Sequence, residues 1–199
     1  DQEEIDRVAP IIEAVKARFD VPVSLDTYKS AVAEAGIAVG ADLINDIWGL
    51  KYDPKMADVI AKADAACCLM HNRDNSDYGD FLSEWYQETA ECVELAKKAG
   101  IADDRIILDP GVGFGKTYEQ NLTTIKYMDD LKKLGYPLLL GTSRKSVIGL
   151  TLDTPVTDRA VGTAVTTVFA VQQGYAFVRV HDIKANKQAI QMTKAILNA

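Results

Sequence analysis

Polar side chains stand at the ends of six apolar stretches of the chain. They are Asp26, Asn45, His71, Asp109, Ser143 with Arg144 and Lys145, and Arg179 with His181. Carboxylate and amide oxygens accept hydrogen bonds from the amine and ring N–H edge of a planar heterocycle. By contrast, Lys145, Arg179 and His181 suit an anion such as a phosphate or a diphosphate. The pattern therefore predicts a bipolar site, with a nitrogen-rich ring at one end and an anionic group at the other.

The stretch after Asp109 carries glycine at positions 111, 113 and 115. It is not a P-loop, because that motif needs glycine where Pro110 stands, and the dinucleotide fingerprint places its third glycine differently. We expect these glycines to let the backbone pass close to a ligand or to a neighbouring helix. Arg179 and His181 are two residues apart, so on a strand their side chains point the same way.

Each of these residues also has a purely structural interpretation. Asp26 and Asp109 could cap helices or close loops, Arg179 could pair with Asp182 or with an acid on a helix, and His71 alone is more typical of a buried structural histidine. Because polar residues end six successive strands, the functional interpretation is favoured. A metal site at Cys67, Cys68 and His71 is not expected, since adjacent residues on a strand face opposite ways.

Composition limits the class of protein. The 199 residues, 48% hydrophobic and 26% charged, are typical of one globular domain over residues 1–199. The net charge of −7 argues against a nucleic-acid or anionic-membrane surface. No apolar run is long enough to span a bilayer, and the first ten residues are no signal peptide. Three cysteines make no disulfide framework, which predicts a reducing cytoplasm.

Strands and helices are predicted to alternate along the chain. The predicted strands are 21–27, 41–47, 65–71, 106–108, 137–143 and 176–182. The predicted helices are 3–19, 29–39, 55–62, 81–98, 120–134, 158–173 and 184–197. Pro10 predicts a kink or a late start in the first helix, residues 72–80 are expected to be a mobile polar loop, and a loop is expected before Thr157. The helix at 158–173 is almost entirely apolar, so we expect it to be well buried.

This alternation predicts an α/β protein with a parallel sheet. An open doubly wound sheet and a (β/α)₈ TIM barrel are the two candidate architectures. Polar residues at every strand end favour the barrel, since an open sheet gathers its ligand at one switch point. Only six βα units are recognisable and the chain begins with a helix. We therefore expect the first two strands of the barrel to be absent from this chain.

Six motifs together resemble one family. In order they are DTYK (26–29), NDI (45–47), MH (70–71), LDPGVGFGK (108–116), GTSRKS (141–146) and RVHD (179–182). They are similar to the motifs of dihydropteroate synthase, a pterin-binding barrel enzyme of folate biosynthesis, and their order and spacing match along the whole chain. The resemblance implies condensation of 6-hydroxymethyl-7,8-dihydropterin diphosphate with p-aminobenzoate, giving 7,8-dihydropteroate and diphosphate.

The resemblance also implies roles for individual residues. Pterin would be bound by Asp26, Asn45, Ile47, Met70, Asp109, Phe114, Gly141 and Lys145. Arg179 and His181 would hold the diphosphate, and Ser146, Lys145 and Phe114 would border the p-aminobenzoate site. Lys145, Asp109, Arg179 and His181 would be the catalytic residues, acting through orientation and electrostatics.

The resemblance further implies a Mg²⁺ cofactor and a homodimer formed through late helices. The family's metal-binding Asn lies on its first strand, which has no counterpart here, so no metal ligand is expected in this chain. The loop that follows the family's second strand and closes over p-aminobenzoate also has no counterpart. On this reasoning we expect the chain alone to hold much of the pterin site without turning over.

Three other interpretations compete. The pterin-binding domain of a methyltetrahydrofolate methyltransferase shares the barrel and the pterin site, but would lack the SRKS and RVHD motifs. A non-catalytic pterin-binding paralogue or fragment is favoured only by the missing N-terminal loops. A generic phosphate-binding barrel enzyme would not need Asn45 and two acids that face a ring.

Overall fold

The computed structural model describes all 199 residues, from Asp1 to Ala199. The chain divides into two compact units, the first made of residues 1–72 and 87–108 and the second of residues 73–86 and 109–199. Helix α4 (Phe81–Lys98) belongs partly to each unit. The single domain over residues 1–199 therefore stays a prediction.

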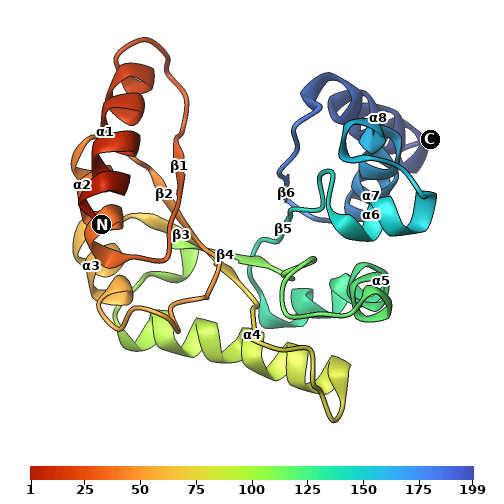
Figure 1. The fold of residues 1–199 in the computed structure, drawn as a ribbon, viewed down its shortest axis with the longest axis horizontal. Helices are drawn as coiled ribbons and strands as arrows, with labels where there is room; N and C mark the ends of the chain where they lie inside the picture. The colour runs from red at the N-terminus through yellow and green to blue at the C-terminus, as the bar shows by residue number, and fades with distance from the viewer. The chain divides into compact units, whose positions relative to one another are not determined.

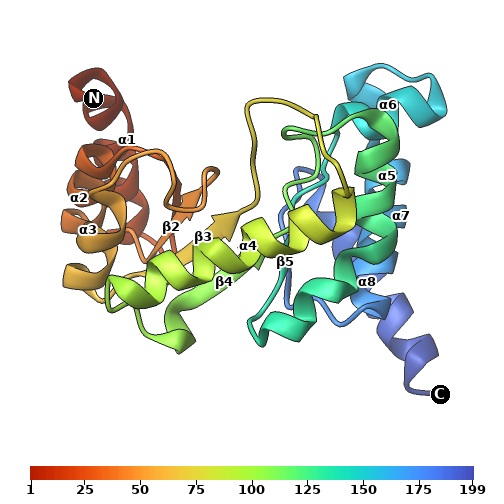
Figure 2. The same cartoon turned by 90° about the horizontal axis from the view of Figure 1, so that it is seen from below.

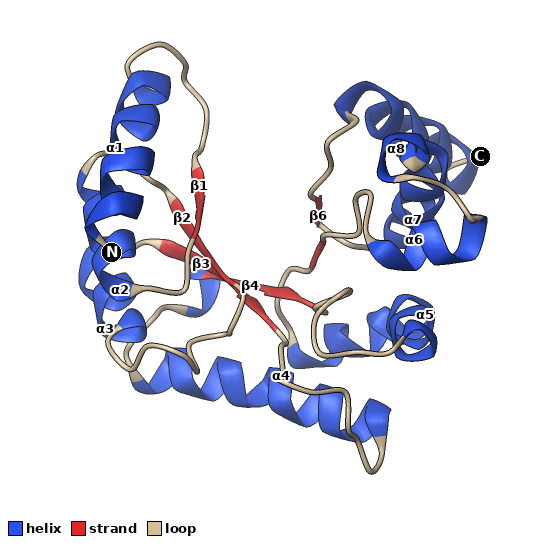
Figure 3. Ribbon diagram, viewed as in Figure 1, coloured by secondary structure: helices blue, strands red, loops and turns tan.

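Four strands form a sheet in the order β1-β2-β3-β4 (Figure 3). They are β1 (Ser24–Asp26), β2 (Leu43–Asp46), β3 (Ala66–Met70) and β4 (Ile106–Asp109), and only Asp109 belongs to the second unit. The first three strands are parallel, with Leu25 opposite Ile44 and Ile44 opposite Cys67. A 3₁₀ turn at Asp103–Arg105 leads into β4. The strand ends at Asp26, Asp46 and Met70 therefore share one edge of the sheet.

Helices α1 (Gln2–Lys16), α2 (Ser30–Ala38) and α3 (Met56–Ala63) lie side by side in the first unit (Figures 1 and 2). Because successive strands are neighbours and parallel crossovers are right-handed, the connecting helices fall on one face of the sheet. A doubly wound sheet would instead reverse its strand order and place helices on both faces. Helix α2 sits so close to β1 that a Cβ at Gly36 would come within 2.3 Å of the Leu25 side chain.

The second unit consists mainly of helices around a short parallel pair of strands. Its elements are α5 (Tyr118–Tyr127), a 3₁₀ helix (Met128–Leu134), β5 (Leu139–Leu140), α6 (Ser146–Leu152), a 3₁₀ turn (Val156–Asp158), α7 (Ala160–Gln172), β6 (Phe177–Val178) and α8 (Ile183–Leu197). Strands β5 and β6 pair with Leu139 opposite Phe177. Thr117 begins α5 with a reciprocal capping box to Gln120, the local reason for a helix start there.

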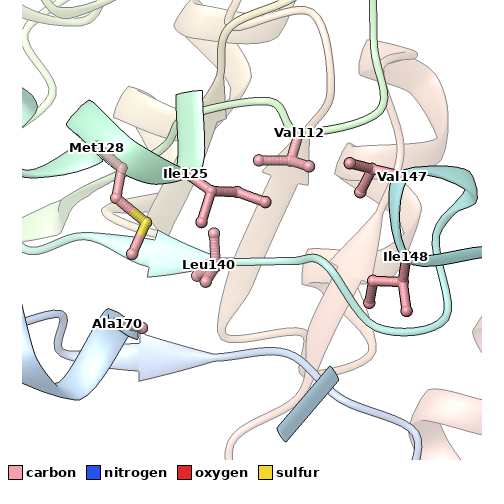
Figure 4. Close-up of a cluster of buried hydrophobic side chains, with 7 residues drawn as sticks. All are labelled: Val112, Ile125, Met128, Leu140, Val147, Ile148 and Ala170. Carbon is pink, nitrogen blue, oxygen red and sulfur yellow. The ribbon is translucent and has the colours of Figure 1, made fainter. Parts of the chain in front are cut away.

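One buried cluster holds the second unit together (Figure 4). Its members are Val112, Ile125, Met128, Leu140, Val147, Ile148 and Ala170. They come from the glycine-rich loop, α5, the 3₁₀ helix that follows it, β5, α6 and α7, so the cluster fixes that loop against the helices. Complete burial of one large aliphatic side chain contributes about 1.5–3 kcal/mol.

Several element boundaries differ from those predicted. Helix α1 begins at Gln2 and continues through Pro10, so a late start was wrong. Residues 146–152 form helix α6, which was not predicted and whose last three residues lie where a loop was expected. The predicted strands at 137–143 and 176–182 are two paired residues each, because their polar ends leave the ladder. Helix 120–134 is an α-helix only to Tyr127 and continues as a 3₁₀ helix.

The predicted burial of the apolar helix near 158–173 is also wrong. In helix α7 only four side chains are buried, whereas Val161 is 75% exposed and Val165 and Phe169 are exposed as well. The buried side includes Thr163, Thr166 and Thr167, which hydrogen-bond to neighbouring groups. The helix therefore packs through its threonines and shows an apolar face to solvent. No helix of the chain is long and apolar enough to cross a membrane.

Candidate functional site

Asp26 and Asn45 lie together at the ends of β1 and β2, where they are register partners. The Asn45 amide Nδ2 donates to Asp26 Oδ1 at 2.9 Å. Asn45 is 1% exposed, yet its Oδ1 has no hydrogen-bond partner. A buried acceptor without a donor costs free energy unless a ligand supplies one. The first unit therefore offers a carboxylate next to an open amide oxygen.

Two apolar residues predicted to line the ring slot are also in the first unit. Met70 ends β3 and is completely buried, and Ile47 is half-buried in the turn that follows β2. This turn is closed by Asp46, whose Oδ1 accepts from Trp48 N and whose Oδ2 accepts from Leu50 N, both at 2.8 Å. Asp46 thus fixes the backbone that carries Ile47.

Asp109 is the central acid of the second unit. It is 1% exposed; its Oδ1 accepts from Gly111 N at 2.8 Å, and its Oδ2 has no hydrogen-bond partner. A Cβ on Gly141 would lie 3.3 Å from that Oδ2 and 3.5 Å from Arg179 Nη2, so the bare glycine keeps both groups uncovered. Burial raises the pKa of the Asp109 carboxyl, and the nearby charge of Lys145 opposes that rise.

The glycine-rich loop after Asp109 is held by lysines. Gly111, Gly113 and Gly115 all have positive φ, which bends the loop so that its carbonyls point at side chains. Lys116 Nζ donates to the carbonyls of Gly111 and Phe114, both at 3.0 Å. Lys145 Nζ donates to the Val112 carbonyl and lies 4.6 Å from the centre of the Phe114 ring.

Other side chains hold the remaining groups of this loop. Trp85 Nε1 donates to the Pro110 carbonyl at 3.0 Å, and the Tyr78 hydroxyl donates to the Gly115 carbonyl at 2.8 Å. Asn121 Oδ1 accepts from Gly113 N at 2.5 Å. The loop is therefore a fixed wall, and Phe114 and Lys145 form part of it.

The loops after β5 and β6 are joined by two polar contacts. Ser143 Oγ lies 2.8 Å from His181 Nδ1 and accepts from His181 N at 3.1 Å. The Arg144 guanidinium donates two hydrogen bonds to the Asp182 carboxylate, at 2.7 and 3.0 Å. Arg144 therefore holds the pKa of Asp182 below its usual range. In this structure Asp182 forms its ion pair with Arg144.

The predicted site residues thus fall into two groups, one in each unit. The first unit contains Asp26, Asn45, Ile47 and Met70, and the second contains Asp109, Phe114, Gly141, Lys145, Ser146, Arg179 and His181. Ser146 is the exposed first residue of α6. His71 is buried and pairs with Glu88 at 2.9 Å, as expected for a structural histidine.

Sequence reasoning gave no role to Lys116, to Trp85 or to the Ser143–His181 contact. The lysine stands inside the motif DPGVGFGK, and its distance of two residues from Phe114 could have indicated a loop clamp. The serine is the last residue of a predicted strand, but no local pattern pairs it with a residue 38 positions away.

The described residues, which are the whole chain, contain no group of three or more His, Cys, Asp or Glu side chains that could hold a metal ion. The three cysteines are free and buried, and burial raises the pKa of both Cys67 and Cys92 to about 12. A raised pKa favours the protonated thiol, which is a weaker nucleophile than the thiolate, at Cys67 and Cys92. A Mg²⁺ cofactor stays a prediction.

Parallel βα units with polar side chains at the carboxyl ends of their strands are typical of α/β barrel enzymes, whose active sites lie at those strand ends. The chain belongs to the pterin-binding enzyme family, whose description is "Pterin binding enzyme" and whose model matches residues 1–181.

Relatives and solved structures agree with this family. The chain is 54% identical to dihydropteroate synthase of Clostridium beijerinckii, over 99% of this chain and 74% of that protein. It is 46% identical to the Bacillus subtilis enzyme, over 100% of this chain and 70% of that protein. A Clostridium difficile dihydropteroate synthase structure, obtained in the presence of pteroic acid, matches with a TM-score of 0.96 and 46% identity, covering 98% of this chain and 74% of that one. A Yersinia pestis dihydropteroate synthase in complex with a sulfonamide drug matches with a TM-score of 0.95 and 36% identity, covering 100% and 74%. The predicted barrel fold class and family are confirmed.

Proposed function

We propose that this protein acts as a dihydropteroate synthase, joining 6-hydroxymethyl-7,8-dihydropterin diphosphate to p-aminobenzoate. The substrate has a ring edge rich in N–H donors and an anionic leaving group. The observation that carries the proposal is the pair of buried acceptors without partners, Asn45 Oδ1 and Asp109 Oδ2. Both would receive N–H donors from the pterin's aminopyrimidine edge. Asp26, which is bound to Asn45, would accept from the same edge.

The remaining pterin contacts follow from the side chains around these acceptors. The family's motifs assign Ile47 and Met70 of the first unit, and Gly141 and Phe114 of the second, to the flat pterin ring. Lys145 would donate to the pterin carbonyl and to a ring nitrogen. Its hydrogen bond to the Val112 carbonyl supports this role, since that contact holds the ammonium beside the Phe114 ring.

The reaction forms a C–N bond and breaks a C–O bond. The amine nitrogen of p-aminobenzoate attacks the exocyclic methylene carbon of the pterin, diphosphate leaves with the bonding electrons, and the amine loses a proton. Asp109 would stabilise the positive charge that develops on the ring, while Arg179 and His181 would stabilise the departing anion. Ser146, Lys145 and Phe114 would border the p-aminobenzoate. The residues present do not form a metal site, so no step is assigned to Mg²⁺.

Binding and turnover together test this proposal. We expect the pterin diphosphate to bind with an affinity measurable by titration calorimetry, and Lys145→Ala to weaken that binding at least about 10-fold, because a charge-assisted hydrogen bond is lost. Lys126→Ala is the matched control, an exposed lysine of α5. Dihydropteroate formation from the two substrates is then followed by chromatography. Equal pterin affinity in Lys145→Ala and in the parent protein would refute the site assignment.

We also infer that a second copy of this chain covers the exposed side of α7. A groove of about 530 Å³ lies between α5, α6 and α7, and its lining includes Leu122, Ile148, Leu152, Val165 and Phe169. Its surface is almost wholly apolar, which is unfavourable in water and typical of an interface between copies. Together with the family's homodimers, this supports a dimer through the late helices.

Analytical ultracentrifugation tests the dimer. We expect the parent protein to sediment as a dimer at micromolar concentration, and Val165→Asp to sediment as a monomer, because a buried unpaired carboxylate is costly. Leu95→Asp is the control, an exposed leucine of α4 outside the groove. A monomeric parent protein, or a dimeric Val165→Asp, would contradict the inference.

A further inference from the structure

Ser143 and His181 make a two-point contact across the loops after β5 and β6. The His181 backbone N–H donates to Ser143 Oγ at 3.1 Å, and the same oxygen lies 2.8 Å from His181 Nδ1. The serine thus binds both the main chain and the ring of one residue. This leaves Nε2 as the ring nitrogen that is free to meet a ligand.

The direction of the second hydrogen bond follows from the protons available. A serine hydroxyl has one proton to donate, and its oxygen already accepts from the His181 backbone. Within the protein, His181 Nδ1 is the acceptor that lies within hydrogen-bond distance of this hydroxyl. The arrangement that uses every group has the hydroxyl donating to Nδ1, so a neutral ring carries its proton on Nε2.

We propose that Ser143 is a positioning residue for His181. Its hydroxyl donates a hydrogen bond to Nδ1, so that the protonated Nε2 points toward the departing anion. The role of the anion rests on the proposed function; the hydrogen bond and the ring orientation do not. The bond gives the anion an N–H donor at a fixed point even when the imidazole is uncharged. A ring free to turn about χ2 would present Nδ1 or a carbon in part of the population.

The residues next to Ser143 and His181 in the sequence are themselves fixed by hydrogen bonds. Next to it, the Arg144 side chain holds Asp182 in a two-hydrogen-bond ion pair. The Arg144 backbone N–H donates to Thr163 Oγ1 at 3.1 Å, and its carbonyl accepts from Arg159 Nη1 at 3.0 Å. The Asp182 carbonyl accepts from Asn186 Nδ2 at 2.9 Å, which fixes the start of α8. These hydrogen bonds fix the backbone next to Ser143 and next to His181, so the contact between the two residues joins two fixed loops.

Histidine NMR gives a readout that a merely structural serine would not move. The chain has two histidines, so ¹⁵N-labelled histidine yields two ring signals, and His181→Gln assigns them. At pH 8.5, where imidazole is ordinarily neutral, we expect His181 to have an unprotonated, hydrogen-bonded Nδ1 and a protonated Nε2. In Ser143→Ala the Nδ1 signal should move toward that of free imidazole, and a second tautomer should appear. Ser143→Thr should restore the parent spectrum, while the buried His71 signals report that the fold is intact.

A proton on Nδ1 of His181 in the parent protein would overturn the proposal, as would identical His181 signals in Ser143→Ala and the parent. Calorimetry with inorganic diphosphate adds the functional side. We expect Ser143→Ala to weaken diphosphate binding about 5-fold, with Ser143→Thr within about 2-fold of the parent. Thr157→Ala removes an exposed hydroxyl of the same unit and is the control. If the parent protein binds no diphosphate, the proposed function fails, and the NMR result still decides the role of Ser143.

Discussion

Asp46 and Asp109 are two buried carboxylates, each the last residue of a strand, and they differ in how their oxygens are used. Both oxygens of Asp46 accept a backbone N–H at 2.8 Å, from Trp48 and Leu50. Only Oδ1 of Asp109 does so, from Gly111, and Oδ2 has no partner. Burial raises the pKa of both carboxyls, so that shift alone does not distinguish them.

The difference lies in what closes the turn that follows each acid. The turn after β2 is closed by Asp46 itself, so both oxygens of its carboxylate already accept hydrogen bonds from the backbone. The loop after β4 is closed by other side chains, above all Lys116 at its own end and Trp85 and Tyr78 from outside it. These side chains do the structural work that Asp46 does for its own turn. Asp109 therefore keeps one oxygen for a ligand.

The comparison predicts opposite outcomes for one substitution at the two sites. In Asp109→Asn the amide nitrogen would replace the open oxygen and face the N–H donors of the pterin. We expect pterin affinity to fall about 100-fold, or about 2.7 kcal/mol, as measured by calorimetry. At pH 4 the free energy of unfolding should change by less than about 1 kcal/mol, because Oδ1 still accepts from Gly111. A protein destabilised without loss of affinity would make Asp109 structural.

Asp46→Asn should have the reverse effect. Its amide nitrogen must face one of the two backbone N–H groups of the turn. Two buried donors would then face each other, and one backbone N–H would lose its acceptor. We expect the free energy of unfolding to fall by about 2 kcal/mol, measured by urea denaturation. Pterin affinity should stay within about 3-fold when it is measured well below the melting temperature. Unchanged stability would show that the two hydrogen bonds do not hold the turn.

The pH dependence of stability sharpens the comparison. Because the folded pKa of Asp109 is raised, its stability contribution is complete below the ordinary carboxyl pKa of about 4 and is lost as pH rises through the folded pKa. The parent protein should therefore lose stability relative to Asp109→Asn above about pH 4, by at most about 1.4 kcal/mol per pH unit.

Urea unfolding from pH 4 to pH 8 measures this difference. Asp42→Asn is a control of opposite sign, because the Val23 N–H and then Lys16 lower the pKa of Asp42. The contribution of Asp42 is present above the ordinary carboxyl pKa and is lost as pH falls. Parallel curves for the parent and Asp109→Asn would mean that the Asp109 pKa is not shifted in the folded protein.

The sequence could predict the fold class and the residues at the strand ends, because both follow from local patterns. Apolar runs that end in a polar residue indicate buried strands. The charge and hydrogen-bonding type of the residues at their ends do not depend on the conformation of the loops that follow. Asn45 and Asp109 were predicted in this way, and each has an open acceptor oxygen. That Asn45 Oδ1 and Asp109 Oδ2 lack hydrogen-bond partners, however, can be seen only in the three-dimensional structure.

Features that depend on distant residues could not be predicted. The burial of α7 was predicted from its apolar composition, but its threonines face inward because Thr142 and Asn186 offer hydrogen bonds there. Helix α6 was missed because its seven residues follow the polar Ser-Arg-Lys stretch and include a glycine at 149. A Cβ at this position would overlap the Arg159 guanidinium, so the glycine makes room for that side chain.

The smallest expected effect concerns Lys116, which does for the Asp109 loop what Asp46 does for its own turn. Lys116→Met keeps the length of the side chain and removes both N–H donors. We expect a loss of about 1 kcal/mol in the free energy of unfolding, smaller than for Asp46→Asn because Lys116 is half-buried whereas Asp46 is completely buried. Amide hydrogen exchange at residues 111–115 should quicken more than exchange in α5. Lys126→Met is the control. Equal exchange in Lys116→Met and in the parent protein would show that the loop keeps its conformation without the lysine. The open oxygen of Asp109 would then not depend on Lys116.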